Sequence, residues 1–260
     1  MMQGFPIIKH PSQHIPVPIL VSIPHYGTEA LPHIRREDYT EPWFETFAYG
    51  FADTFVGDLY ADLHQHGATI VATPVSRIFV DVNRRRNDFD QVDGFVRSQR
   101  GVVRTHTIRD VPIFTRALSP MELEARLQSL YDPYYTTIEQ LLQRLRAHHG
   151  HALLLDSHTG SPRRMQDSQV ILGTSHGATS DVALVDTIAA LFTAHGFEVH
   201  RNIRGYAGGN IVRTYGRPHT QQVHAVQIEV NAALLITTSR QEFIAQVSRG
   251  ETPATATENV

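Results

Sequence analysis

Short apolar runs separated by longer amphipathic stretches make up most of the hydrophobic pattern of the chain. Residues 152–155 are the clearest run, because consecutive apolar side chains after Gly150 are typical of a strand buried on both faces. Runs of the same kind predict further strands at residues 17–23, 69–72, 78–82, 169–173, 197–200 and 225–231. Helical spacing predicts helices at residues 42–67, 119–145 and 179–194.

This alternation is typical of an α/β fold with a central, mostly parallel or mixed twisted sheet and helices on both faces. Pro133 is expected to kink or divide the second helix. We expect an irregular lead-in at residues 1–16, a long loop over the sheet at residues 87–118 and a frayed tail at residues 250–260. No internal repeat or linker interrupts the pattern, so we expect a single domain over residues 1–260.

The composition is that of a soluble globular protein, with 41% hydrophobic and 19% charged residues. A formal net charge of −3 gives no reason to expect nucleic acid or an anionic membrane as a partner, and no apolar run is long enough for a membrane span. Residues 1–18 contain no signal-peptide core, so we expect a cytoplasmic location. Because the chain has 16 histidines and no cysteine, a zinc site must use histidine and carboxylate ligands.

Two histidines stand at the ends of predicted strands. His158 follows the run at residues 152–155, and Asp156 should point to the same side of that strand, where its carboxylate can orient the imidazole as a metal ligand. His25 follows the run at residues 17–23 in the same way. Taken alone, each histidine fits a buried structural role about as well as a ligand role.

Charged residues near other element ends extend this set. Glu41, at the start of a predicted helix, either complements the helix dipole or lies at the mouth of the sheet as a metal ligand. Arg77 and the pair Asn83-Arg84 flank one predicted strand, either as a solvated turn or as donors to an anionic substrate. Glu229 lies inside a predicted strand, where burial is costly unless the carboxylate is paired or catalytic.

Taken together and in their order along the chain, these histidines, acidic residues and arginines resemble the pattern of the N-formylglutamate amidohydrolase family. The resemblance covers most of residues 17–235 and rests on residues 23–27, 76–84, 156–158, 171–177, 206–209 and 227–231. That family is similar in fold and mechanism to the zinc carboxypeptidases, so the resemblance implies a zinc-carboxypeptidase-like α/β fold. The chain departs from the family pattern at Pro42, which precedes Trp43, and at Ala232-Ala233, which follow the last predicted strand.

The resemblance implies one Zn²⁺ per chain, bound by His25, His158 and Glu41, with Glu29 as the alternative carboxylate ligand. It also implies that Glu229 acts as the general base and that Arg77 stabilises the oxyanion. The residues implied to bind the substrate are Asn83, Arg84, Tyr206, Gly208, Gly209 and His176.

The implied activity is zinc-dependent hydrolysis of the amide bond of an N-acyl acidic amino acid, such as N-formyl-L-glutamate, to formate and glutamate. The expected partner is therefore a small-molecule N-acyl amino acid. A carboxypeptidase-like peptidase or another N-acyl amino acid amidase is an alternative, because zinc, water and a glutamate serve the hydrolysis of any amide. A second alternative is a non-catalytic protein that binds a metal or small carboxylates. The sequence leaves the oligomeric state open.

Overall fold

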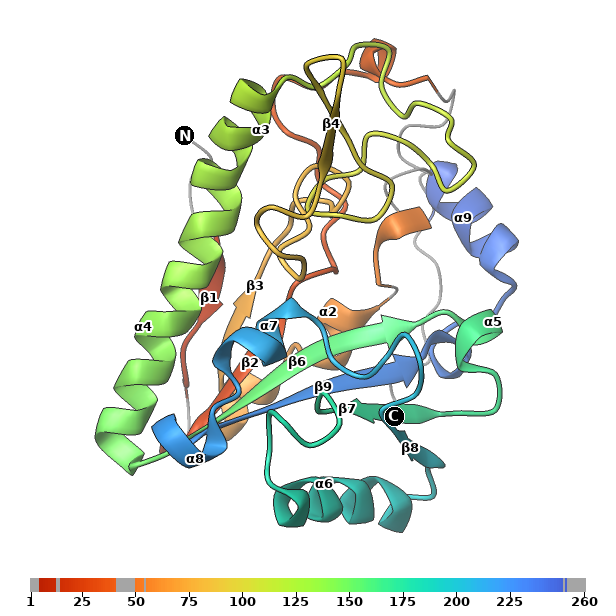
Figure 1. Cartoon of the computed structure of the whole chain (residues 1–260). Coiled ribbons are helices and arrows are strands. Elements are labelled where there is room, and N and C mark those ends of the chain that lie inside the picture. Colours follow the sequence, from red (N-terminus) through yellow and green to blue (C-terminus); the bar gives the residue numbers. More distant parts are fainter. Residues whose placement is uncertain (1–4, 13–14, 41–49, 54, 250, 252–260) are drawn as a thin grey trace.

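The structure is a computed structural model that describes residues 5–12, 15–40, 50–53 and 55–249, together with Glu251. Its centre is a seven-stranded mixed sheet with the strand order β1-β3-β2-β6-β9-β7-β8 (Figure 1). In chain order these strands are β1 Ile7–Lys9, β2 Ile19–Ile23, β3 Thr69–Ala72, β6 Ala152–Gly160, β7 Val170–Gly173, β8 Val199–Arg201 and β9 Val223–Asn231.

The strands β3, β2, β6 and β9 are neighbours and run parallel. At the edges, β1 lies antiparallel to β3, β7 lies antiparallel to β9, and β8 pairs parallel with β7. The strands β6 and β9 pair over their whole length, which sets His158 directly opposite Glu229. The four parallel strands end at one edge of the sheet, the place where open α/β folds bind ligands.

Helices cover both faces of the sheet, as predicted (Figure 1). The helical segments are η1 Arg36–Asp38, α2 Val56–Leu59, η2 Leu63–His66, α3 Pro120–Arg126, η3 Leu127–Tyr131, α4 Asp132–His149, α5 Pro162–Met165, α6 Val182–Ala194, α7 Asn210–Tyr215, α8 Pro218–Gln221, η4 Ala232–Leu234 and α9 Arg240–Ser248. Helices α4 and α7 pack on the face that carries Leu20 and Leu154, whereas α2 and α6 pack on the opposite face. Within the described ranges, no helix combines the length and apolar character needed to cross a membrane.

The helical segments α3, η3 and α4 follow one another directly and match the predicted helix at residues 119–145. A capping box begins the run, in which Ser119 Oγ accepts from the Glu122 N–H at 3.2 Å and Glu122 Oε2 accepts from the Ser119 N–H at 3.0 Å. The helix is divided near Pro133, as expected: the π-helical segment η3 ends at Tyr131, and Pro133 lies in the first turn of α4, where a proline is tolerated. Gly150 ends α4 in a left-handed conformation, with φ of 79°.

Two segments, residues 78–82 and 87–118, fold differently from what the sequence predicts. Residues 78–82 are a buried turn rather than a strand, because they are enclosed by loops, with the Asp81 N–H donating to Val102 O at 2.7 Å. A short buried apolar run has the same pattern in a turn as in a strand. Within the predicted loop at residues 87–118, strands β4 Asp90–Val92 and β5 Phe95–Arg97 form a hairpin around Asp93-Gly94. An Asp-Gly pair is a turn signal of this kind.

The N-terminal lead-in and the first predicted helix also differ from their predictions. The predicted lead-in contains the edge strand β1. The described part of residues 42–67 is not one helix. Gly50 and Phe51 are helical, the helix is broken between them and α2, where Phe55 has a φ of 54°, and α2 and η2 are short separate segments. Residues 41–49 lie outside the described residues, as does the predicted tail apart from Glu251.

Candidate metal centre and active site

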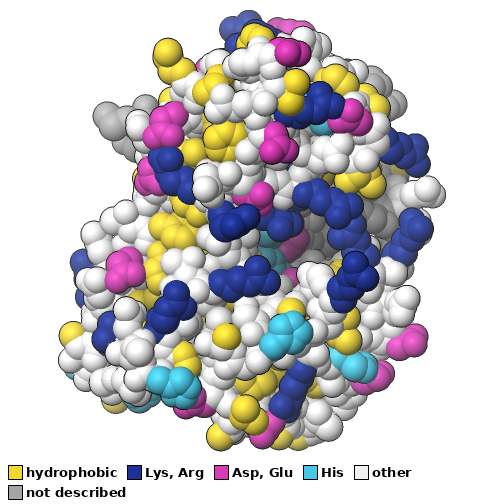
Figure 2. All heavy atoms as spheres, viewed as in Figure 1, with side chains coloured by type: hydrophobic (Ala, Val, Ile, Leu, Met, Phe, Trp, Pro, Cys, Tyr) yellow, Lys and Arg dark blue, Asp and Glu magenta, His cyan; other side chains and the backbone are white. Residues whose placement is uncertain are grey.

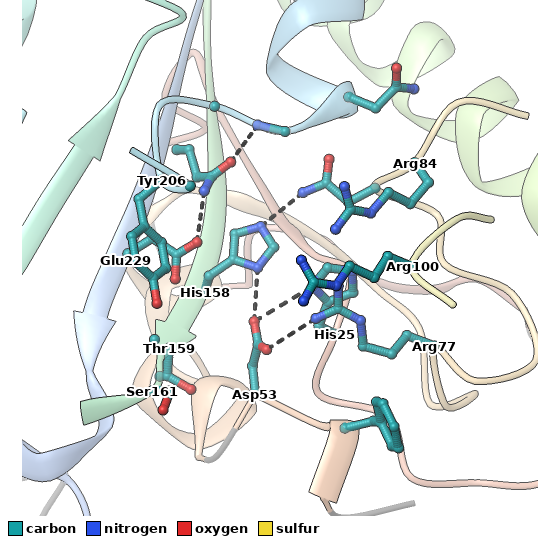
Figure 3. A pocket seen from close by; sticks show the side chains of 18 of the residues that line it. His25, Asp53, Arg77, Arg84, Arg100, His158, Thr159, Ser161, Tyr206 and Glu229 are labelled. Carbon is teal, nitrogen blue, oxygen red and sulfur yellow. Dashed lines mark hydrogen bonds and ion pairs between the residues drawn. The ribbon is translucent and has the colours of Figure 1, made fainter. Parts of the chain in front are cut away.

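Two histidines and one aspartate from separate parts of the chain converge at the carboxyl edge of the sheet. His25 follows β2, Asp53 precedes α2, and His158 lies on β6; one ligand atom from each lies within 4.8 Å of the others. The Nδ1 atom of His158 is 2.8 Å from Asp53 Oδ2, and the Nδ1 atom of His25 is 3.6 Å from the same oxygen (Figure 3). The backbone helps to fix this position, because the Asp53 N–H donates to His25 O at 2.9 Å.

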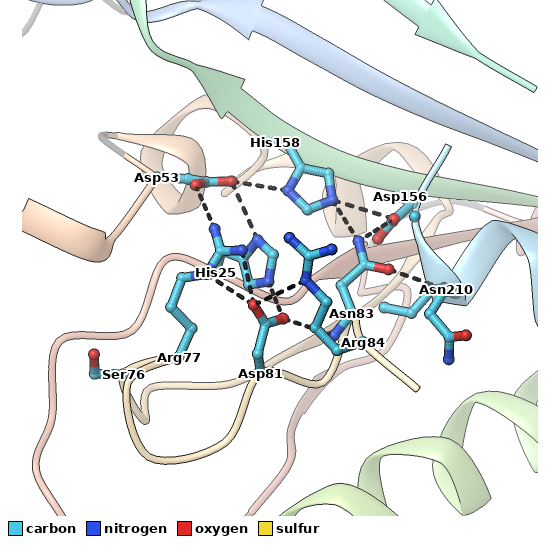
Figure 4. Close-up of polar contacts among 12 residues, drawn as sticks. His25, Asp53, Ser76, Arg77, Asp81, Asn83, Arg84, Asp156, His158 and Asn210 are labelled. Atoms are coloured by element: carbon cyan, nitrogen blue, oxygen red, sulfur yellow. Dashed lines mark hydrogen bonds and ion pairs between the residues drawn. The ribbon is translucent and has the colours of Figure 1, made fainter. Parts of the chain in front are cut away.

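The opposite ring nitrogens of the two histidines face buried carboxylates (Figure 4). His25 Nε2 lies 2.7 Å from Asp81 Oδ1, and His158 Nε2 lies 3.1 Å from Asp156 Oδ2. Both carboxylates are fully buried. A carboxylate that accepts a hydrogen bond from Nε2–H favours the tautomer with a lone pair on Nδ1. Metal-binding histidines are commonly oriented in this way.

The donor atoms present fit a divalent cation. His25 Nδ1 is buried and has no hydrogen-bond partner among the described residues. Buried polar nitrogens are nearly always paired, so an unpaired lone pair aimed at a carboxylate and a second imidazole is best explained by a ligand that accepts it. Two imidazoles and one carboxylate, with a further position open, are a typical catalytic zinc set.

The local electrostatics also favour a cation. Burial would lower the pKa of His158, but the negative charges of Asp156 and Glu229, together with hydrogen bonds that the imidazole donates to Asp156 and Asp53, raise this pKa well above its usual value. Burial would raise the pKa of Asp53, but the two histidines hold it below its usual range. An excess of negative charge around two imidazoles attracts protons or a metal ion alike.

Glu229 lies beside the cluster on β9, opposite His158, and only 7% of it is exposed. Burial raises the pKa of Glu229 to about 7, with the positive charge of His158 opposing this shift and Asp53 and Asp156 adding to it. The Gln227 side chain donates to Glu229 Oε1 at 2.7 Å. A carboxyl group with a pKa near neutrality can both accept and release a proton at physiological pH.

Two arginines from the turn after β3 surround Asp81. Arg77 donates to Asp81 Oδ2 through Nε at 3.1 Å and Nη2 at 2.8 Å, and its Nη1 lies 3.6 Å from Asp53 Oδ1. Burial would lower the pKa of Arg77, but the charges of Asp81 and Asp53 raise it. Arg84 is more loosely held, with its Nε 3.8 Å from Asp81 Oδ2.

The side chain of Asn83 connects the cluster of His25, Asp53 and His158 to helix α7. Its Nδ2 donates to Asp156 Oδ2 at 2.7 Å, and its Oδ1 accepts from the Ile211 N–H at 2.9 Å (Figure 4). Gly209, just before α7, packs against this amide, since a Cβ atom there would come within 3.0 Å of the Asn83 side chain. The close approach therefore requires glycine at this position.

A cavity of about 1460 Å³ opens above these residues and is lined mainly by polar and charged side chains. Tyr206, Gly208 and Gly209 contribute to its wall, and burial raises the pKa of Tyr206 to about 12. Arginines surround the hollow visible in Figure 2, and those in the wall are Arg77, Arg84, Arg85, Arg100, Arg104, Arg164, Arg213 and Arg217. Such a wall favours anionic ligands.

The sequence profile of the N-formylglutamate amidohydrolase family matches residues 17–236. The chain belongs to this family. Two relatives named N-formylglutamate deformylase, from Pseudomonas aeruginosa and Pseudomonas putida, are 32% and 30% identical to it over 224 residues, or 82% of this chain and 80% of each relative. The predicted membership of the family is thus confirmed, and the chain is an amidohydrolase.

A solved structure shows the same fold. The crystal structure of an N-formylglutamate amidohydrolase from Ralstonia eutropha superposes with a TM-score of 0.76 at 23% identity, covering 94% of this chain and 93% of that one. This likeness confirms the predicted α/β fold of the amidohydrolase and its mixed sheet.

The structure brings most of the predicted site residues of this amidohydrolase to the cavity. His25, His158, Glu229, Arg77, Asn83, Arg84, Tyr206, Gly208 and Gly209 all line it. His176 and the alternative ligand Glu29 are exposed and lie outside its wall. Glu41 lies outside the described residues, so its role as a ligand stays a prediction.

Asp53 is the site residue that sequence reasoning missed. The repeating pattern of Phe51 and Phe55 suggested a continuous helix, in which Asp53 would point away from the apolar stripe. The helix is instead broken at this point, which turns the aspartate toward the histidines. The signal available in the sequence was a single carboxylate, Asp53, between the apolar residues Phe51 and Phe55.

Proposed function

We propose that this amidohydrolase hydrolyses N-formyl-L-glutamate to formate and glutamate, with a divalent cation such as Zn²⁺ held by His25, Asp53 and His158. The observation that carries the proposal is the convergence of these three donor groups beside a buried glutamate with a pKa near neutrality. The names of the relatives from Pseudomonas support the substrate. The arginine-rich cavity wall supports an anionic compound of this kind.

His25, Asp53 and His158 would hold the cation, and a set of three protein ligands is typical of catalytic zinc sites that also bind a water molecule. A bound zinc ion would lower the pKa of a water molecule and polarise the formyl carbonyl. Asp81 and Asp156 hold the outer ring nitrogens of His25 and His158, so that both Nδ1 lone pairs remain directed at the site.

Glu229 is the proposed general base and general acid. Its Oε1 accepts a hydrogen bond from Gln227, so Oε2 is the oxygen that takes the proton from the attacking water. Glu229 then delivers this proton to the amide nitrogen, because an amine anion is too poor a leaving group. A pKa of about 7 suits both steps at neutral pH.

Arginines and an amide are proposed to position the substrate. Arg77, held by Asp81 and directed at Asp53, is placed to stabilise negative charge on the former carbonyl oxygen. Arg84 is only loosely paired and can bind the α-carboxylate. Asn83 is proposed to contact the α-carboxylate of the substrate through its Nδ2 group, which is held by Asp156 at 2.7 Å and lies 3.0 Å from His158 Nε2.

The test is release of formate and glutamate from N-formyl-L-glutamate by the wild type and by Glu229→Gln. We expect the variant to keep its metal and its fold and to lose activity by about 10²- to 10⁴-fold, because it cannot take up the proton. Glu198→Gln is the control, since Glu198 is exposed and lies outside the cavity wall. Near-wild-type turnover by Glu229→Gln would refute its assignment as the base.

A second candidate is hydrolysis of larger N-acyl amino acids or of peptides with a free C-terminus. The volume of about 1460 Å³ favours it, because small-ligand pockets commonly occupy roughly 300–1,000 Å³. A panel of N-formyl, N-acetyl and dipeptide substrates with the same C-terminal glutamate separates the two. Faster turnover of the longer substrates would favour this second candidate.

A further inference from the structure

Two arginines on the loop between β5 and α3 have no role in the chemistry described above. Arg100 is exposed but lines the cavity, and Figure 3 shows its side chain directed toward the same region as those of Arg77 and Arg84. Arg104 also lines the cavity and is 9% exposed. Both therefore add positive charge next to the proposed substrate site.

The buried Arg104 guanidinium is incompletely paired. Its Nη1 donates to Gln99 O at 2.9 Å and its Cζ lies 4.9 Å from the centre of the Phe51 ring, but Nε is enclosed and has no hydrogen-bond partner among the described residues. Burial, aided by the charge of Arg77, lowers the pKa of Arg104 to about 10, so the side chain is still charged at neutral pH. Burying such a charge without a carboxylate is costly.

Two of the carboxylates nearest the catalytic cluster are already engaged. Asp81 accepts from Arg77 and His25, and Asp53 faces the two histidines. Neither Arg100 nor Arg104 forms an ion pair with any carboxylate that the structure describes. The charges of Arg77, Arg84 and Arg100 all act on Arg104, with that of Asp81 opposing them, so the four guanidiniums share one region of the cavity wall.

The loop that carries this charge is fixed to the segment that carries Arg84. The Val102 N–H donates to Asp88 O at 2.9 Å, and the Arg104 N–H donates to Ile78 O at 2.9 Å. Gly101 lies so close to Asp88 O that a Cβ atom there would overlap it. The backbone that carries the two arginines is therefore fixed in advance of binding, which reduces the entropic cost of ordering this loop around a ligand.

We propose that Arg100 and Arg104 bind the second, side-chain carboxylate of a dicarboxylic N-acyl amino acid, while Arg84 binds the α-carboxylate. This inference rests on the proposed function and adds to it the residues that select an acidic side chain. A neutral side chain of the same shape would leave the buried Arg104 charge unpaired, so it should be rejected by about 10²-fold or more in kcat/KM.

The experiment compares kcat and KM for N-formyl-L-glutamate and N-formyl-L-glutamine, which have nearly the same shape, in the wild type, Arg100→Gln and Arg104→Gln. For each variant we expect kcat/KM for the glutamate compound to fall by about 10- to 100-fold, mainly through KM, because a charge-assisted contact is lost. The glutamine compound should change by less than about 3-fold, since it never makes that contact. Arg104→Lys should recover part of the selectivity.

Arg163→Gln is the matched control, because Arg163 is exposed and lies outside the cavity wall. If Arg104→Gln does not fold, as judged by its thermal melting, Arg100→Gln decides the question, since Arg100 is exposed. Equal losses for both compounds, or an unchanged preference, would overturn the inference while the proposed function stands. Hydrolysis of neither compound by the wild type would instead overturn the proposed function, and this inference with it.

Discussion

The ring nitrogens of His25 and His158 have different surroundings on their two sides. Each Nε2 faces a buried carboxylate, and each Nδ1 faces Asp53 and the cavity. A histidine held only for packing has no need of an unpaired buried Nδ1, as His25 has here among the described residues. This asymmetry is the strongest argument at the residue scale for a bound cation.

The identity of the carboxylate ligand can be tested with a pair of variants. Asp53→Asn should lose most of its bound metal, because the neutral amide is a much weaker ligand for zinc than a carboxylate. Glu41→Gln should keep its metal, since Asp53 already completes a three-ligand set. Metal content after dialysis, measured by atomic emission, checks both. Loss of metal in Glu41→Gln with retention in Asp53→Asn would make Glu41 the ligand.

At the scale of elements, the contact of Gly209 with Asn83 links helix α7 to the cluster of His25, Asp53 and His158. Gly209→Ala should displace the Asn83 amide, destabilise the protein by about 1–3 kcal/mol and also lower kcat, because Asp156 loses the hydrogen bond to the oxygen that faces His158. Gly94→Ala is the control; it strains a hairpin turn with φ of 80° and open space around it, remote from the site. Melting temperature and kcat are measured for both.

In that comparison, Gly94→Ala should be destabilised with an unchanged kcat in the folded protein. Full kcat in Gly209→Ala would mean that Asn83 does not help to hold Asp156 for catalysis.

The elements predicted from sequence are those whose signal is local. The strands β6 and β9 have continuous or alternating apolar patterns, and periodicity sets Asp156 and His158 on one side of β6 and Gln227 and Glu229 on one side of β9. That His158 lies opposite Glu229 depends on the pairing register, which the sequence does not show. The capping box at Ser119 likewise predicted the start of α3. Residues 78–82 could not be assigned correctly, because their burial comes from distant loops that no local pattern reveals. Asp53 was missed because a broken helix has the same apolar spacing as an intact one.

At the scale of the whole molecule, the parallel strands bring residues that are far apart in sequence to one edge of the sheet. His25, Asp53, His158 and Glu229 come from four separate segments, yet all line one cavity. The chain carries a formal net charge of −3, but the cavity wall is rich in arginine. A positive cleft of this kind concentrates small anions near the site and should do so less effectively at high ionic strength.

The central claim is metal-dependent hydrolysis at the cluster of His25, Asp53 and His158. The most direct measurement is the metal content of the purified protein, together with hydrolysis of N-formyl-L-glutamate before and after chelation. We expect about one zinc per chain, loss of activity when the metal is removed and recovery when zinc is returned. A protein that holds no metal and regains none, or that stays fully active after its metal is removed, would contradict this account.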